Sequence, residues 1–368
     1  MRNNSFDRLY DEISEGLLSL FGPWSEEVES LEWTFDGELT LLQARNMTGS
    51  IVVRGGDVDT ILISAVKTVR GPTEDAATHF ARRVRVQAGR RDTAAYTYAA
   101  YPRPFLGCGV FVRYEITVPR AIDVQLYTQS GGLAIAGIEG AVEAETRGGN
   151  IELTDTVGPA QLYTAAGAIR ISGVEGSVDA ESGNGSVLLR RSKGRSRLRT
   201  TSGAVTISES MGIIEARNYS GDINLYRGRG GAQIETVEGD IRAAFQRIVE
   251  PVSLLTHTGS VLMDVLISDA QIEAESYEGD VQIALSSDFS GRLDAGTAEG
   301  GVVCGLPFVA TGALPEAMPG DTDLLAEGSS SDARPGSRAL VGRLGSGGPT
   351  LVKLRSLRGD ISVTARDV

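Results

Sequence analysis

Histidine and cysteine, which supply much of the acid–base, nucleophilic and metal chemistry of proteins near neutral pH, are scarce in this chain. The 368 residues contain two histidines, His79 and His257, and two cysteines, Cys108 and Cys304. The sequence offers no acid or nucleophile to pair with either histidine, and the cysteines belong to no CxxC or Cys/His cluster. We therefore expect structural or solvated histidines, no disulfide framework, no metal or other cofactor, and a protein that is not an enzyme.

Aspartate recurs directly after glycine, which raises calcium binding as an alternative. β-Rolls built from nonapeptide repeats bind calcium at their turns through the pattern G-G-x-G-x-D. This chain instead generally carries one glycine, followed after a single residue by the apolar one, and Asn150, Ser186 and Ala204 occupy positions equivalent to the aspartates. We therefore favour a structural role for these aspartates, which are Asp222, Asp240, Asp280 and Asp360.

Glycine recurs at a fixed spacing of nine, at thirteen consecutive positions from 131 to 239. With 46 glycines in 368 residues, chance does not produce such a series. Two nonads alternate, G-x-V-x-A-x-T and G-x-I-x-L, and together they make an 18-residue unit. The pattern continues with looser spacing towards the C-terminus. The predicted turn glycines are Gly131, Gly140, Gly149, Gly158, Gly167, Gly176, Gly185, Gly194, Gly203, Gly212, Gly221, Gly230, Gly239, Gly259, Gly279, Gly300 and Gly359.

Apolar and polar residues alternate within each nonad, as is typical of a β-strand with one buried face. Two strands of about five residues, joined by glycine turns, would complete one rung every 18 residues. Because a single rung cannot bury its own apolar face, each rung must stack on the next. Glycine suits the corners, since a tight turn there favours positive φ. The sequence thus predicts an all-β protein, a β-solenoid (β-helix) of 18-residue rungs with two strands per rung.

Five segments follow from these patterns. Residues 1–30 form an amphipathic N-terminal α-helix, expected to dock on the body or on a partner rather than on a membrane. Residues 31–128 are an irregular β-rich cap with one short helix around TEDAATHFARR, and residues 129–305 are the solenoid. Residues 306–349 are a Gly/Pro/Ser-rich insertion, expected to be a mobile loop. Residues 350–368 are the last rung.

The last rung contains Arg358-Gly359-Asp360, a tripeptide that cell-adhesion receptors read. Val352, Leu354 and Ser356 precede it at the positions that Val, Ala and Ser or Thr take in other rungs. The register therefore favours Gly359 as a corner glycine over a receptor tag.

The basic run RRSKGRSRLR, residues 190–199, resembles a nucleic-acid patch when it is taken alone. In repeat register, however, Arg197 and Arg199 point outward from one strand. Stacked strands lie about 4.8 Å apart, so we expect Arg197 between Asp179 and Glu215, with Arg199 beside Glu181. We favour this ladder of ion pairs over a phosphate site.

The second outer face of the stack carries fewer charges than the face with Arg197. A flat, weakly charged sheet is a candidate docking surface for a partner, a glycan or a second copy of the chain. Its candidate residues are Leu188, Thr206, Asn224, Leu262 and Gln282.

Net charge and hydropathy limit the partners and the location. A net charge of −13 argues against nucleic acid or an anionic membrane as a general partner. The N-terminus lacks the pattern of a signal peptide, and no segment reaches the roughly 20 apolar residues of a membrane span. We expect a cytoplasmic protein with no transmembrane segment, an unidentified protein or glycan partner, and self-association as an alternative.

The stretches QSGGLAIAGIEGAVEAETRGGNIEL, SGAVTI and SGDINL, preceded by EITVP, resemble a bacterial β-strand-repeat family named "putative adhesin", a domain of unknown function. The resemblance covers roughly residues 33–305 and returns at 350–366. It implies a β-solenoid with no established catalytic residues, similar to head domains of surface proteins. For some members it implies a link to envelope-stress systems.

Three classes of function remain. We favour a non-catalytic, adhesin-like binding or interaction scaffold, with a link to envelope or stress signalling. One alternative is a self-assembling filament protein resembling bactofilins, although a cap would block end-to-end growth. The second is a carbohydrate-binding or carbohydrate-active β-helix protein, whose rungs are usually longer and carry an acidic groove.

Overall fold

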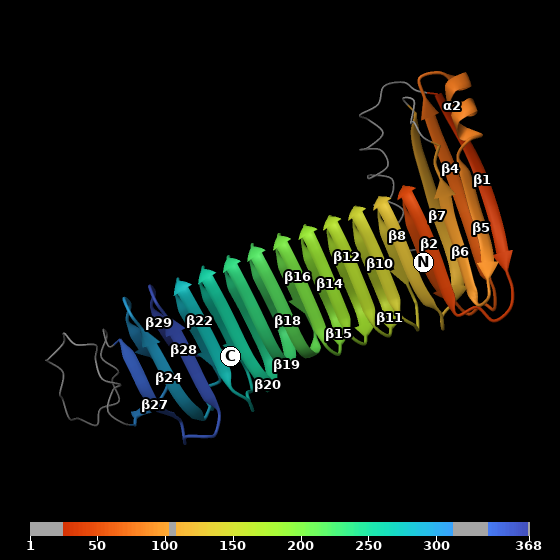
Figure 1. Ribbon diagram of the computed structural model, residues 1–368. Helices are drawn as coiled ribbons and strands as arrows, with labels where there is room; N and C mark the ends of the chain where they lie inside the picture. The colour runs from red at the N-terminus through yellow and green to blue at the C-terminus, as the bar shows by residue number, and fades with distance from the viewer. Residues whose placement is uncertain (1–24, 103–107, 312–337, 367–368) are drawn as a thin grey trace.

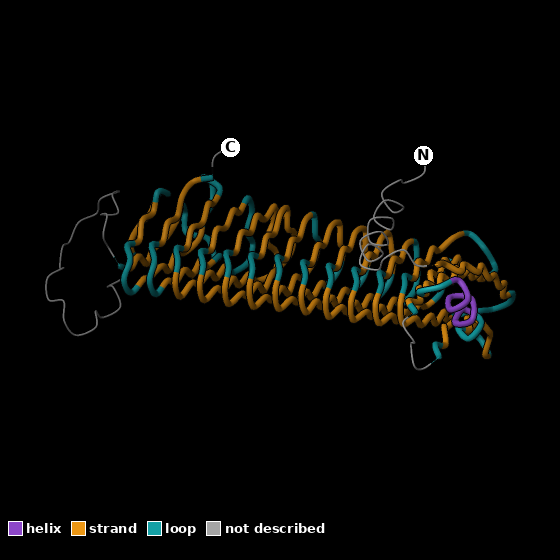
Figure 2. The backbone as a smooth tube through the Cα atoms, turned by 90° about the horizontal axis from the view of Figure 1, so that it is seen from above, coloured by secondary structure: helices purple, strands orange, loops and turns teal. Residues whose placement is uncertain are grey.

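The chain folds as one elongated β-solenoid with a taller cap at one end (Figure 1). The computed structural model describes residues 25–102, 108–311 and 338–366. The all-β fold class and the stacked short rungs are confirmed. The strands form two long parallel ladders that run along the stack, and loops link them at the edges (Figure 2).

Face A is the outer surface of the first ladder, which carries Arg197. Its strands are β2 (Leu41–Thr48), β8 (Asp123–Ser130), β10 (Val142–Gly148), β12 (Ala160–Ala166), β14 (Val178–Asn184), β16 (Ser196–Ser202), β18 (Met211–Ser220), the second halves of β19 (Ile223–Glu238) and β20 (Ile241–Thr258), β22 (Ile272–Glu278), β28 (Leu351–Ser356) and β24 (Gly291–Thr297).

Face B is the outer surface of the second ladder. Its strands are β3 (Ile51–Gly56), β9 (Leu133–Ala136), β11 (Ile151–Val157), β13 (Ile169–Glu175), β15 (Val187–Lys193), β17 (Val205–Ser208), the first halves of β19 and β20, β21 (Val261–Val265), β23 (Val281–Leu285), β29 (Ile361–Ala365) and β25 (Val302–Cys304).

The pairing register confirms the 18-residue rung. Val142 lies opposite Ala160, and Ala160 lies opposite Val178, so each strand pairs with the strand 18 residues later. From Ala232 onward the rung lengthens to 20 residues, because Ala232 pairs with Val252 and Val252 with Ile272. The alternating apolar residues point inward along the whole stack and form one continuous core.

A column of buried hydroxyl groups lies beside the corners between face A and face B. Thr164 Oγ1 donates to the Gly149 carbonyl at 2.9 Å, and Thr200 Oγ1 donates to the Gly185 carbonyl at 2.9 Å. Ser182 Oγ makes the equivalent bond to Gly167 at 2.9 Å. The Ser or Thr that ends the first nonad therefore satisfies a corner carbonyl of the preceding rung, which is the physical reason for its recurrence.

The corner glycines are required mainly because the rungs approach each other closely. A Cβ atom on Gly149 would lie 2.1 Å from the Gly131 carbonyl oxygen, and φ of Gly149 is +157°. A Cβ on Gly359 would lie 2.2 Å from the Gly279 carbonyl oxygen. The predicted positive φ is therefore only part of the reason for glycine; the stacking distance excludes a side chain.

Each rung of the regular part also bends within its face B strand. The bend falls on a residue with positive φ, and six such residues recur every 18 positions: Gly137, Asp155, Gly173, Arg191, Glu209 and Arg227. Four of the six are not glycine, although positive φ costs an L-residue about 1–2 kcal/mol. Each rung thus has its two predicted strands, and the bend turns the end of the face B strand into a short third side of the rung.

The cap differs from its prediction because part of residues 31–128 belongs to the stack. β2 pairs in parallel with β8, and β3 pairs in parallel with β9, so residues 41–56 form the first rung. The chain then leaves the stack and returns at β8. The remaining cap strands are β1 (Ser25–Phe35), β4 (Ile61–Gly71), β5 (Arg85–Arg91), β6 (Ala94–Ala100) and β7 (Gly109–Pro119).

The cap covers the end of the stack with mixed pairing. β6 lies against β2 and β7 against β3 in parallel, whereas β1–β4–β7 and β5–β6 pair antiparallel. The expected short helix is α2 (Glu74–Ala81), which begins at the N-cap Thr73 and buries Phe80. The predicted helix of residues 1–30 lies mostly outside the described residues. Residues 25–30 belong to β1 instead.

The C-terminal rung is last in sequence but not in space. β28 lies between β22 and β24, and β29 lies between β23 and β25, in parallel register on both sides. The spatial order of the corners is therefore Gly279, Gly359, Gly300. The prediction that residues 350–368 form the terminal rung is wrong in space, because the sequence spacing cannot show which neighbour a returning segment selects.

The predicted insertion is partly ordered in strands. β26 (Phe308–Ala310) and β27 (Ala339–Leu344) pair antiparallel, and β27 also pairs antiparallel with β24. These strands cover the β24 edge of the last rung. Residues 312–337 of the insertion lie outside the described residues.

Candidate binding surfaces

The five candidate docking residues share one column of face B. Leu188, Thr206 and Asn224 lie on successive rungs, and Leu262 is paired with Gln282 further along. Arg242 lies between Asn224 and Leu262 in this column. Its guanidinium pairs with the carboxylates of Asp222 at 3.2 Å and Asp240 at 2.7 Å. The five residues therefore do lie in one column of face B, but the charged cluster of Arg242, Asp222 and Asp240 divides it. The role of the column in docking stays a prediction.

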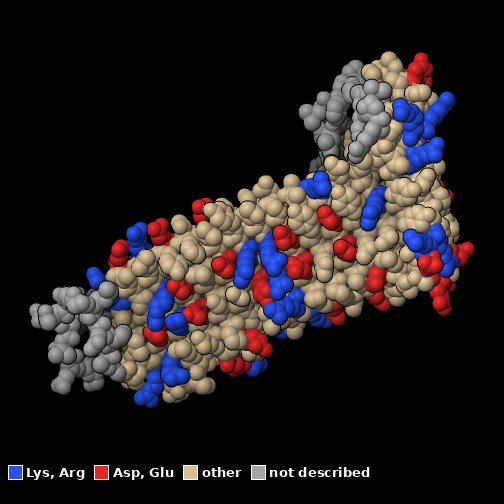
Figure 3. All heavy atoms as spheres, in the orientation of Figure 1, with Lys and Arg blue, Asp and Glu red and all other residues tan. Residues whose placement is uncertain are grey.

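Face A carries the predicted ladder of ion pairs. Arg197 lies between Asp179, at 3.5 Å, and Glu215, at 2.9 Å. Arg199 contacts Glu181 at 3.6 Å, as expected. Charged side chains gather midway along this face, over β14, β16 and β18 (Figure 3). Arg197 and Arg199 of the basic run are therefore partnered within the sheet.

Glu215 is the most strongly held carboxylate in the ladder. Hydrogen bonds from Arg195 and then Arg197 lower the pKa of its carboxyl group below the usual value. Its side chain is 19% exposed. The charge on Glu215 is thus favoured by the fold.

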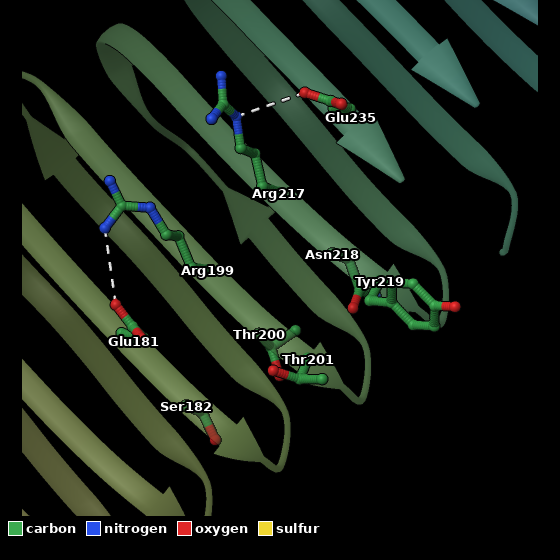
Figure 4. Close-up of a pocket in the computed structure, with 9 residues that line it drawn as sticks. All are labelled: Glu181, Ser182, Arg199, Thr200, Thr201, Arg217, Asn218, Tyr219 and Glu235. Carbon is green, nitrogen blue, oxygen red and sulfur yellow. Dashed lines mark ion pairs between the residues drawn. The ribbon is translucent and has the colours of Figure 1, made fainter. Parts of the chain in front are cut away.

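Next to this ladder, face A is hollowed. The hollow has a volume of about 330 Å³ and is open to solvent. In Figure 4 Arg199 and Arg217 lie along one side, and Thr201 and Tyr219 lie along the other. The remaining lining residues are Glu181, Ser182, Thr200, Asn218 and Glu235.

The hollow forms because side chains of very different size occupy equivalent positions on successive rungs. Tyr219 is 56% exposed, and Thr201 and Gly183 occupy its column on the two preceding rungs. The tyrosine therefore stands at the edge of a low area of the sheet. The exposed ring borders the hollow, and no large side chain precedes it in the column.

The ion pairs at the hollow are long. Arg217 Nε lies 3.4 Å from the Glu235 carboxylate, and Arg199 Nη1 lies 3.6 Å from Glu181. Charge-assisted hydrogen bonds between such groups are usually about 2.7–2.9 Å long. Both guanidinium groups therefore keep donor capacity that a ligand can use.

The Tyr219 column continues away from the hollow with one half-buried valine and three exposed side chains. Val237, His257, Tyr277 and Leu357 follow on successive rungs. The rings of His257 and Tyr277 stack at a centroid distance of 4.8 Å, with 16° between their planes. The ring faces that His257 and Tyr277 turn toward each other are therefore not available to a ligand.

The Gly-Asp pairs have a structural role. The Asp222 carboxylate accepts the backbone N–H of Asp240 at 3.0 Å, and the Asp240 carboxylate accepts that of Ser260 at 2.9 Å. Asp360 accepts the N–H of Gly301 at 2.8 Å. Each aspartate thus caps the next rung in space. Within the described ranges no group of acidic, histidine or cysteine side chains is arranged to hold a metal ion.

The Arg-Gly-Asp tripeptide is built into the stack. Arg358 pairs with Glu278 at 2.8 Å and with Glu299 at 3.8 Å. The corner position of Gly359 and the cap made by Asp360 account for the other two residues.

The histidines and cysteines lie apart from one another. His79 is in α2 of the cap, whereas His257 is on face A. Cys108 lies beside the cap strand β7, and Cys304 lies in β25 at the far end, so no disulfide joins them. Burial raises the pKa of the Cys304 thiol, which disfavours the reactive thiolate.

The hollow was not among the sequence predictions. Its signal in the sequence is the face A column that runs Gly183, Thr201, Tyr219, in which small residues precede a large ring. The first rung was also missed, although MTGSIVV at residues 47–53 shares the Gly-x-Ile-x-Val spacing of later rungs closely enough to identify Gly49 as a corner.

Comparison with protein families supports the resemblance for part of the chain. Residues 208–300 match the family model described as Toastrack DUF4097. The segment spans regular rungs from β18 to β24. The resemblance to a β-strand-repeat family of unknown function is thereby confirmed in this region. No curated protein matches the chain.

Three solved structures share low identity with the chain. A "putative cell adhesion protein" from Clostridium sporogenes is 9% identical, with 94% of this chain and 100% of that chain covered and a TM-score of 0.19. A "putative adhesin" from Bacteroides fragilis is 12% identical, covers 92% and 98%, and has a TM-score of 0.26. A "putative adhesin" from Parabacteroides distasonis is 8% identical, covers 92% and 97%, and has a TM-score of 0.28. Within the described residues, no helix has the length and hydropathy needed to cross a bilayer.

Proposed function

We propose that this protein is a non-catalytic, adhesin-like binding scaffold, and that the hollow beside Tyr219 on face A is its ligand site. The observation that carries the proposal is the combination in one hollow of an exposed ring face and two incompletely engaged guanidinium groups. The stacked rungs hold these groups at a fixed spacing, since every strand beneath them is paired on both sides.

The chemistry of the hollow favours a glycan. A sugar residue presents C–H groups that pack on an aromatic face and hydroxyl groups that pair with planar donors and acceptors. Tyr219 supplies the first kind of contact, and Arg199, Arg217, Glu181 and Glu235 supply the second. Each arginine already faces a carboxylate, Glu181 or Glu235, at 3.6 or 3.4 Å. The hollow therefore favours a ligand that is neutral or weakly acidic.

The two ends of the stack favour a single binding body over a filament. Antiparallel strands lie in the cap, as β1–β4–β7, and on the β24 edge of the last rung, as β27–β26, whereas β25 of that rung pairs only with β29 among the described strands. End-to-end growth requires open parallel edges that continue the ladders.

Binding to a glycan microarray tests the proposal. We expect the intact chain to bind a defined set of glycans and Tyr219→Ala to lose at least tenfold in affinity. Tyr163→Ala is the matched control, because Tyr163 is 42% exposed on the same face and does not line the hollow. Equal binding by all three proteins, or no glycan bound by the intact chain, would refute the assignment.

A further inference from the structure

The C-terminal strand pair, β28 and β29, occupies a slot in the stack. The slot is the space between the rung β22–β23 and the rung β24–β25, which are consecutive in sequence. Its occupant arrives from a distant part of the chain (Figure 1). All of its strand contacts are parallel ladders to the two bordering rungs.

The chain between the two bordering rungs is short enough for them to stack directly on each other, without a slot between them. Gly300 follows Gly279 by 21 residues, and Gly279 follows Gly259 by 20, which is the length of a rung that stacks directly. Register does not require a slot either. Ile272, Val352 and Leu293 are aligned, so the bordering rungs would meet in register if the slot closed by one strand spacing.

Charge disfavours direct contact between the bordering rungs. Glu273 of β22 and Asp294 of β24 lie in one column, with Lys353 between them. Lys353 Nζ lies 2.5 Å from the Glu273 carboxylate. Closure would place Glu273 directly beside Asp294, and like charges opposite each other on a sheet are destabilising.

The same pattern holds at the corner, and Arg355 of the next column reaches back to Asp294. Arg358 lies between Glu278 and Glu299, at 2.8 and 3.8 Å. Arg355 Nη2 contacts the Asp294 carboxylate at 2.7 Å. The face A side of the slot and its corner are therefore acidic, and β28 with the corner that follows it is basic, whereas β29 carries no charged residue.

The strand pair also completes the hydrogen bonds of both bordering rungs. Ser356 Oγ donates to the Gly279 carbonyl at 3.0 Å, and Thr297 Oγ1 donates to the Gly359 carbonyl at 2.8 Å. The backbone N–H of Asp360 donates to Asp280 Oδ1 at 2.9 Å. An empty slot would leave two parallel edges and these buried groups without partners.

A glycine-rich connection links the strand pair to β27. Residues 345–350, GSGGPT, pass around the end of β24, which separates β27 from β28. Gly345 and Gly347 have φ of +58° and +81°. This connection alone determines whether the strand pair enters the slot of its own chain.

From these observations we propose that the slot is a receptor site for a basic β-strand pair, and that the C-terminal strand pair of a second copy of this chain can occupy it. Every contact that fills the slot is the same whether the strand pair comes from the same chain or from a partner. Exchange between two copies is therefore expected whenever the connection cannot reach its own slot.

A shortened connection tests the proposal. Deletion of residues 345–348 leaves two residues between β27 and β28, which span at most about 11 Å. The two strands are about 9.6 Å apart with β24 directly between them, so the short connection cannot pass around β24. We expect a folded dimer with twice the mass of one chain in light scattering and an unchanged circular dichroism spectrum. The matched control, deletion of residues 328–331 (GSSS), should keep the oligomeric state of the intact chain.

Charge reversal distinguishes exchange from other association. Adding Lys353→Glu and Arg358→Glu to the shortened chain should abolish the dimer, because the strand pair would then face carboxylates on both sides. A dimer that survives both substitutions overturns the proposal. A folded monomer from the shortened chain with its C-terminus sensitive to protease overturns it as well.

A second measurement decides the question if the shortened chain does not fold. The intact chain is refolded from urea with a labelled synthetic peptide of residues 350–366 at millimolar concentration, which is comparable with the effective concentration of a tethered segment. We expect the refolded protein to retain label, and the peptide with Lys353→Glu and Arg358→Glu to be retained at least tenfold less. No retained label, or equal retention of both peptides, contradicts the proposal.

Discussion

Two neighbouring glycines provide a sharp test of the stacked corners. Gly149 and Gly148 are adjacent in sequence, but a Cβ on Gly149 would lie 2.1 Å from the Gly131 carbonyl oxygen, whereas a Cβ on Gly148 would come no closer than 3.9 Å to its nearest neighbour, the Gln129 carbonyl oxygen. Gly149→Ala should therefore disrupt the stack, and Gly148→Ala should not.

The structure gives the size of the effect. Positive φ at Gly149 costs alanine about 1–2 kcal/mol. Relief of the 2.1 Å contact must displace the corner, which weakens the bonds from Gly149 N–H to Ala166 and from Gly131 N–H to Gly148, at about 1 kcal/mol each. We expect Gly149→Ala to lower the free energy of unfolding by about 3–4 kcal/mol, and Gly148→Ala to change it by less than about 1 kcal/mol.

Urea unfolding followed by circular dichroism measures both variants against the intact chain. The midpoint should fall strongly for Gly149→Ala and stay nearly constant for Gly148→Ala. A similar small change in both variants would refute the close approach of the corners and, with it, the physical reason given for the nine-residue glycine period.

Two further predictions concern buried and charged side chains. Thr200→Val should lower the free energy of unfolding by about 1–3 kcal/mol, because the Gly185 carbonyl loses its hydroxyl partner inside the stack; the exposed neighbour variant Thr201→Val should be nearly neutral in the same thermal melt. Glu215 has a lowered pKa in the folded state, so its stabilisation is present above the ordinary value of 4.5 and is lost as the pH falls through the lower folded value. Glu215→Gln should therefore flatten the fall in melting temperature below about pH 4.5, and an unchanged acid profile would contradict the assignment.

Repetition explains why so much of the fold could be predicted from the sequence. A rung contacts only its neighbours, so a short period in sequence becomes a short distance in space. The place of Arg197 between Asp179 and Glu215 followed from that rule alone. The columns of face B followed in the same way.

The rule fails where the next rung in space is not the next in sequence. Val352 pairs with both Ile272 and Leu293, and no local pattern in residues 350–366 distinguishes that position from the end of the stack. The pairing of Glu273 with Lys353 and of Asp294 with Arg355 does indicate the place of β28 in the stack. It can be seen only when the sequences of β22, β28 and β24 are aligned. The bend at Asp155 and Arg191 was missed because non-glycine residues hold positive φ there under the constraint of the stack.

The hollow lay beyond sequence reasoning for a related reason. Its shape depends on differences in side-chain size between rungs, whereas the repeat was identified from what the rungs share. Tyr219, Thr201 and Gly183 occupy equivalent positions, and only their stacking turns that difference into a surface feature.

Disulfide trapping tests the order of the rungs, on which the columns, the slot and the strand exchange all depend. Glu275 of β22 pairs with Arg355 of β28, and Gly296 of β24 lies one strand beyond. Cysteines at 275 and 355 would therefore be about 4.8 Å apart and cysteines at 275 and 296 about 9.6 Å apart, while a disulfide requires Cα atoms within about 7 Å. In a background without Cys108 and Cys304, peptide mass spectrometry after mild oxidation should find the 275–355 link and not the 275–296 link. The opposite result would contradict the account.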